Sequence, residues 1–136
     1  MLFANLVWKG IETMNVRKLD EQGIAVVHSD DVCIVDGQSA LDFMMTIQYE
    51  TGCRSIVLNK GAVIETFFVL STKLAGEVLQ KVVNYHMRLA IVGDFASYSS
   101  KALRDFIWES NRGKQIFFVS SEEEAIKKLG SLESLD

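Results

Sequence analysis

The stretch LAIVGDFASYSSKALRDF, residues 89–106, contains a complete change from strand to helix. Its apolar run, residues 89–92, shows no polar alternation, which is typical of a strand buried on both faces of a parallel sheet. A glycine and an aspartate end that run, and a serine-rich loop follows. Ser99 or Ser100 can cap a helix that begins at Lys101. The stretch therefore predicts one strand–loop–helix unit.

The same unit recurs downstream. The helix over 101–110 leads into QIFFV, residues 115–119, a second continuous apolar run. A helix over 122–129 follows, and Ser121 with Glu124 three residues later forms the capping box that starts it. The pattern predicts a second buried strand followed by a second helix.

The unit also recurs upstream. A short apolar strand over 55–58 precedes a strong helix over 72–85, in which apolar residues recur at helical spacing. Before that strand, a helix over 40–50 is predicted. Ser39 and Asp42 resemble its capping box.

The chain opens with a predicted β-hairpin, strands 15–19 and 24–28, joined by a turn that ends in glycine. The full order is β-β-α-β-α-β-α-β-α. Such alternation is typical of a single layered α/β domain with a mostly parallel sheet, and the hairpin adds an antiparallel edge. We expect the parallel strands 55–58, 89–92 and 115–119 at the centre of the sheet.

The length of 136 residues suits one domain with a substantial core. We expect that domain over 14–130 and a frayed tail over 131–136. Residues 1–13 are expected to be a leader or a non-native start segment, with Met14 as the natural start. The alternative is an extra edge strand or short helix that packs on the domain through the apolar residues 6–8.

The composition is that of a globular protein with an acidic balance. Apolar residues make up 49% of the chain and charged residues 24%, and the formal net charge is −4. Proteins that bind nucleic acid usually carry a basic excess or a basic stripe, and this sequence has neither. No apolar run reaches the roughly 20 residues that a transmembrane helix needs. We therefore expect a cytoplasmic protein that contacts neither nucleic acid nor membrane.

The two cysteines, Cys33 and Cys53, form no CxxC motif. In an acidic chain of this kind they are expected to be reduced thiols, and a disulfide between them is the alternative. Together with His28 and His86 they show none of the paired spacings of a zinc site. The sequence predicts no metal site and no cofactor.

A ligand site, if the protein has one, is expected at the carboxyl edge of the parallel strands. The candidate ligand-binding residues are Asp94, Ser100, Lys101, Arg104, Asn59 and Lys60. Free N–H groups at the start of the helix, with two cations on that helix, favour an anion. The structural alternative is that Asp94 accepts hydrogen bonds from its own loop, residues 96–99, and that the serine only caps the helix. No serine lies in a Gly-x-Ser-x-Gly elbow, and no catalytic residue is predicted.

A longer stretch around this site resembles a bacterial family, the domain of unknown function numbered 4180. The matching residues are Phe67-Phe68, Leu74-Ala75-Gly76-Glu77, Leu79-Gln80-Lys81, Asn84-Tyr85, Ala90 to Phe95, Ser100-Lys101, Asp105-Phe106-Ile107 and Glu109-Ser110-Asn111. The family often carries an acidic residue where this chain has Val69, and a glycine where it has Lys73. The resemblance spans about residues 14–129 and leaves out 1–13.

The family's fold looks similar to the anti-sigma-factor-antagonist (STAS) type of small α/β domain, which mainly mediates regulated protein–protein contacts. With no catalytic constellation in the sequence, we expect a non-catalytic regulatory or protein-binding domain. The alternative is a small-molecule or anion-binding protein, or a small enzyme, with its site around Asp94. An unidentified protein partner and a homodimer are both expected. The homodimer would cover Met87, Trp108 and the two phenylalanine pairs.

Overall fold

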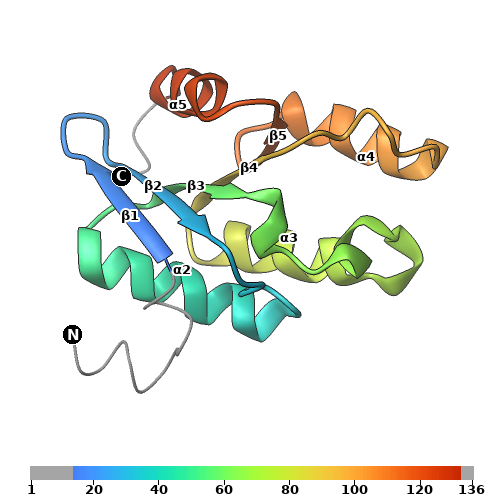
Figure 1. Ribbon diagram of the computed structural model, residues 1–136, viewed down its shortest axis with the longest axis horizontal. Helices are drawn as coiled ribbons and strands as arrows, with labels where there is room; N and C mark the ends of the chain where they lie inside the picture. Colours follow the sequence, from blue (N-terminus) through green and yellow to red (C-terminus); the bar gives the residue numbers. More distant parts are fainter. Residues whose placement is uncertain (1–13, 133–136) are drawn as a thin grey trace.

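The computed structural model describes residues 14–132, which form a five-stranded mixed sheet with helices on both faces (Figure 1). The strands are β1 (Met14–Leu19), β2 (Ile24–Ser29), β3 (Ser55–Asn59), β4 (Arg88–Val92) and β5 (Ile116–Val119). They lie side by side in chain order. β1 pairs antiparallel with β2, and the other pairs are parallel. The predicted hairpin and parallel sheet are confirmed.

Four helices follow the four parallel strands. They are α2 (Gly37–Thr51), α3 (Leu74–Asn84), α4 (Lys101–Asn111) and α5 (Glu122–Gly130). Three short 3₁₀ helices, Lys60–Ala62, Glu65–Phe68 and Leu70–Thr72, connect β3 to α3. The predicted order of elements and the single α/β domain are confirmed. The expectation for residues 1–13, and most of the expected tail, lie outside the described residues.

The helices cover the two faces of the sheet unequally. Leu58 and Ile91 point to the face covered by α2, α3 and α4, whereas Val57 and Ala90 point to the face covered by α5. Right-handed crossovers between strands added in one direction place their helices on one face. The chain after β5 turns to the other face instead, so α5 lies opposite α2 and α3 (Figure 1). The helix α4 packs through Leu103 into the same cluster as α2 and α3.

The helix α2 begins three residues earlier than predicted. Asp36 is its N-cap: Asp36 Oδ1 accepts a hydrogen bond from the Ser39 N–H at 2.7 Å, and Ser39 Oγ accepts one from the Asp36 N–H at 3.0 Å. Ser39 is therefore the third helical residue of the capping box, and its assignment as the cap with Asp42 was wrong. The hydrogen bond from the Ser39 N–H lowers the pKa of the Asp36 carboxyl.

β5 lies at an edge of the sheet, so its predicted central position was wrong. Its side chains are nevertheless buried on both faces, as a continuous apolar run requires. The Asn111 carboxamide occupies the edge: its Oδ1 accepts from the Phe118 N–H at 2.8 Å, and its Nδ2 donates to the Phe118 carbonyl at 3.1 Å. One side chain thereby satisfies the N–H and the carbonyl of Phe118, which a sixth strand would otherwise pair.

In the part of the chain that the structure describes, no helix combines the length and the apolar character needed to cross a membrane. Cys33 and Cys53 are both free and buried. Burial raises the pKa of the Cys33 thiol to about 12.

Candidate functional site

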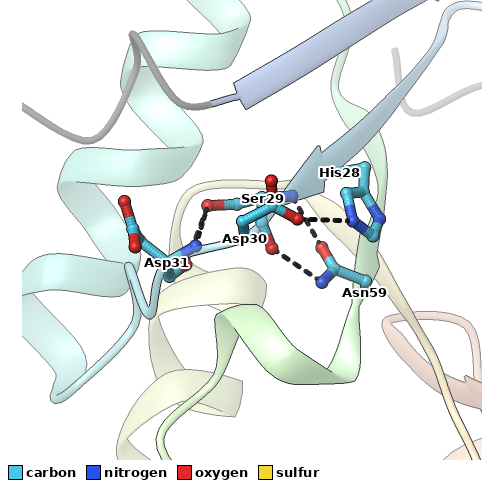
Figure 2. Close-up of polar contacts among 5 residues, drawn as sticks. All are labelled: His28, Ser29, Asp30, Asp31 and Asn59. Carbon is cyan, nitrogen blue, oxygen red and sulfur yellow. Dashed lines mark hydrogen bonds and ion pairs between the residues drawn. The ribbon is translucent and has the colours of Figure 1, made fainter.

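The carboxyl edge of the sheet brings the loops after β2, β3 and β4 together, and Asn59 joins the first two of them (Figure 2). Asn59 Oδ1 accepts from the Ser29 N–H at 2.9 Å, and Asn59 Nδ2 donates to the Ser29 carbonyl at 2.8 Å. The side chain thus continues the ladder between β2 and β3 beyond the last paired backbone groups. Both polar atoms of this predicted site residue hold the fold.

The loop that follows β2 is tied down by its own polar groups (Figure 2). The hydroxyl of the buried Ser29 donates to the Asp31 carbonyl at 2.7 Å and accepts from the Asp31 N–H at 3.2 Å. His28 Nε2 lies 3.3 Å from Asp30 Oδ1, and both side chains are exposed. These contacts fix the direction in which the chain leaves β2 toward α2.

Lys60, the second predicted residue after β3, lies in a cluster of aromatic and acidic groups. Its Nζ is 3.0 Å from Glu65 Oε1, and lies 5.0 Å from the Phe68 ring centroid and 5.2 Å from that of Tyr98. The Tyr98 hydroxyl donates to Glu65 Oε2 at 2.5 Å. That hydrogen bond, together with Lys60, lowers the pKa of the Glu65 carboxyl. The stem of Lys60 also lies directly against Gly93.

Asp94 and Ser100 have the local partners that the structural alternative predicted. Asp94 Oδ1 accepts from the Ala96 N–H at 3.0 Å. Ser100, not Ser99, caps α4, and its Oγ accepts from the Leu103 N–H at 3.2 Å. Both residues shape the turn from β4 into α4, and the Asp94 side chain stays exposed at its surface.

The two predicted cations on α4 do not converge on Asp94. Lys101 Nζ forms an exposed ion pair with Asp105 Oδ2 at 2.7 Å, four residues along the helix. Arg104 is exposed on α4. Within residues 14–132, no ion pair joins Asp94 to either cation. The arrangement around Asp94 is therefore not the positive cluster expected of an anion site.

A cavity of about 410 Å³ opens beside Asp94, between the carboxyl ends of β4 and β5. Residues 93–96 line one side of it, and residues 118–120 with Glu124 of α5 line the other. Of the six predicted site residues, Asp94 alone contributes to this lining. The sequence predicted a site near Asp94, but not the contribution of β5 and α5 to its lining, because that contribution depends on β4 and β5 being neighbours whose following helices lie on opposite faces.

A wider groove of about 710 Å³ separates the first turn of α2 from α3. Its lining residues are Asp36, Gly37, Gln38, Lys73, Gly76, Glu77, Gln80 and Lys81. The residues from α3 recur at three- and four-residue spacing, so they form one stripe along the outer face of that helix. Gly37 brings the two elements close, since a Cβ added there would lie 3.4 Å from Glu77 Cβ.

The sequence prediction missed this groove, although Gly76 gave a signal. A glycine near the start of a helix otherwise rich in good helix formers is unfavourable, and no packing requirement explains it. A Cβ built on Gly76 meets nothing within 4 Å. Lys73, where the resembling family often has glycine, adopts a left-handed conformation with φ of 66°.

Among the described residues, no group of three or more histidine, cysteine and acidic side chains is placed to hold a metal ion. Neither a search of curated proteins nor a search of solved structures found a match. A scan against protein-family models matches residues 19–129, which include every parallel strand and every helix core described above. The chain belongs to the family described as Domain of unknown function (DUF4180).

Proposed function

We propose that the protein is a non-catalytic binding domain that acts through contact with another polypeptide, and that the groove between α2 and α3 is the contact surface. The observation that carries this proposal is the groove itself: it is open, and bare glycine backbone and polar side chains line it. The carboxyl edge of the sheet supports the proposal indirectly, because its polar side chains are already in use. Asn59, Lys60 and Ser100 form hydrogen bonds within the fold.

The chemistry of the groove suits a peptide segment. Its charges alternate: Lys73, just before α3, is followed along that helix by Glu77 and Lys81, and Asp36, the N-cap of α2, lines the groove with them. Mixed charges of this kind give specificity to a polar interface without selecting a strongly charged partner. The alternation therefore favours a polypeptide that carries both signs of charge over a nucleic acid or a small anion.

Two glutamines in the groove are held in place. Gln38 Nε2 donates to Asp42 Oδ1, and Gln80 Nε2 donates to Asn84 Oδ1, each at 2.9 Å. Side chains that are already ordered lose less entropy on binding. The carboxamide oxygen of each glutamine can accept a hydrogen bond from a backbone N–H group of a partner. Within this protein, the carboxamides of Asn59 and Asn111 bind backbone groups in the same way.

The resemblance to STAS-type domains, which mainly mediate regulated protein contacts, favours the same proposal at the level of fold analogy. The expected homodimer has less support. Met87 and the two phenylalanine pairs are buried within the chain, and Trp108 is 58% exposed. The Arg112 guanidinium covers part of the Trp108 ring at 4.4 Å from its centroid. We therefore assign the main contact surface to the groove and not to a self-association patch.

The proposal is tested by photo-cross-linking in cells that naturally produce the protein. A benzoyl-phenylalanine replaces Gln80, an exposed residue of the groove lining, so that Gly76 keeps its bare backbone. The matched control places the same residue at the exposed Glu123 on α5, on the opposite face of the sheet. We expect one discrete adduct from position 80 and none of the same mass from position 123. Equal adducts from both positions, or none from position 80, would overturn the proposal.

A further inference from the structure

The chain segments that leave β4 and β5 turn to opposite faces of the sheet, and this distinguishes the space between them from the rest of the carboxyl edge. The chains that leave β2, β3 and β4 lead to helices on one face, whereas the chain that leaves β5 leads to α5 on the other. Neighbouring parallel strands whose connections part in this way leave a crevice outside their carboxyl ends, where open α/β sheets bind ligands. The cavity of about 410 Å³ lies at this point.

The lining of this crevice combines aromatic and acidic residues. Phe95, from the exit of β4, and Phe118, from β5, both line it, and their ring centroids are 5.4 Å apart at an interplanar angle of 86°. Asp94 and Glu124 line it from opposite sides. The volume is within the range of small-molecule sites, roughly 300–1,000 Å³.

The protein itself orients both carboxylates through one oxygen each. Glu124 Oε1 accepts from the Ser120 N–H and from the Ser120 hydroxyl, both at 2.9 Å, and these bonds lower the pKa of Glu124. Asp94 Oδ1 accepts from the Ala96 N–H. The second oxygen of each carboxylate keeps its capacity to accept a hydrogen bond from a ligand.

Nearby cations do not neutralise the negative charges of Asp94 and Glu124. Lys101 is paired with Asp105, and Lys60 with Glu65. Lys128, one turn along α5 from Glu124, offsets part of its charge but does not line the cavity. The lining therefore carries a negative charge, whereas the anion site expected from the sequence would carry a positive charge.

We propose that the crevice between β4 and β5 binds a small ligand that carries a primary amine next to a compact apolar group. The ammonium group would lie between the free oxygens of Asp94 and Glu124, where both can accept its hydrogen bonds. The apolar group would lie against Phe95, whose ring packs on the buried Phe118. This site is distinct from the groove between α2 and α3, and the proposal does not depend on the function proposed for that groove.

Benzylamine is the test probe, with benzyl alcohol and benzoate as neutral and anionic analogues of the same size. Titrations of the full chain are followed by backbone amide NMR. We expect benzylamine to shift the amides of residues 93–96 and of Ser120 in a saturable way, with millimolar affinity. Benzoate should cause no saturable shift there, and benzyl alcohol should bind more weakly than the amine.

Three variants decide whether the carboxylates are responsible. Glu124→Gln and Asp94→Asn keep an acceptor oxygen for the structural hydrogen bonds but remove the charge. Each should weaken benzylamine binding about two- to fivefold, as expected for one partly exposed charge pair. The control Glu123→Gln removes the same charge from the neighbouring exposed position and should leave the affinity unchanged. An unshifted wild-type spectrum, tighter binding of benzoate, or equal weakening by the control would each overturn the proposal.

Discussion

Replacing Gly93 by alanine tests how closely the exit of β4 is packed against the segment after β3. A Cβ added to Gly93 would lie 2.6 Å from Lys60 Cβ and 2.8 Å from Lys60 Cδ. The Lys60 Cβ is attached to the backbone and cannot rotate away, so one of the two backbones must move. Gly93 is also held to β5, because its N–H donates to the Val119 carbonyl at 2.9 Å.

Overpacking of this kind costs about 1–3 kcal/mol, and we expect Gly93→Ala to lower the free energy of unfolding by that amount in urea titrations. Lys60→Gly removes all three crowding atoms, so in that background Gly93→Ala should be nearly neutral. Lys60→Ala keeps the Cβ and should rescue only in part. A loss of stability by Gly93→Ala that is the same in all three backgrounds would refute the steric argument. Gly76→Ala, with open space at its Cβ, is the control and should not destabilise.

The remaining predictions concern single side chains. Asp94→Ala should destabilise by about 0.5–1.5 kcal/mol through loss of its bond to the Ala96 N–H, and Asp94→Asn by less, in the same urea assay. Lys73→Gly should stabilise by about 0.5–1 kcal/mol, because glycine adopts the left-handed conformation without steric cost; a lower melting temperature would contradict this. Asn111→Ala should uncover the edge of β5 and promote self-association, measured by sedimentation. Cys33, with its thiol pKa raised to about 12, should resist alkylation at pH 8 until the protein unfolds; rapid labelling of the native protein would show that the thiol is accessible.

The fold followed from sequence where the pattern was long and repeated. Each apolar run without alternation became a parallel strand that leads to a helix. The helices α4 and α5 begin at serine caps that the sequence indicated, whereas α3 has no side-chain cap. One error arose where two local patterns competed. Asp36 and Ser39, and equally Ser39 and Asp42, have capping-box spacing, and the backbone bonds decide for the first pair. In β5, a continuous apolar run indicates two covered faces but says nothing about the number of neighbouring strands.

The candidate site was predictable in position but not in chemistry. Sequence placed Asp94 at the carboxyl edge, where a cavity does lie. Hydrogen-bond partners that lie far apart in the chain could not be predicted from the sequence. Glu65 accepts a hydrogen bond from Tyr98, 33 residues away, and Ser29 is bonded to Asn59, 30 residues away. The groove depends on the packing of α2 beside α3, which no local motif encodes.

The binding of the cross-linked partner to groove variants tests the central claim most directly. Gly76→Arg fills the groove, and a Cβ at this position has no neighbouring atom within 4 Å. Glu123→Arg places the same side chain on the opposite face of the sheet. Both variants should melt no lower than the wild type. In calorimetric titrations with the purified partner, we predict at least about a tenfold loss of affinity for Gly76→Arg, the equivalent of about 1.4 kcal/mol, and no loss for Glu123→Arg. Unchanged affinity of Gly76→Arg would contradict the assignment of this groove as the binding surface.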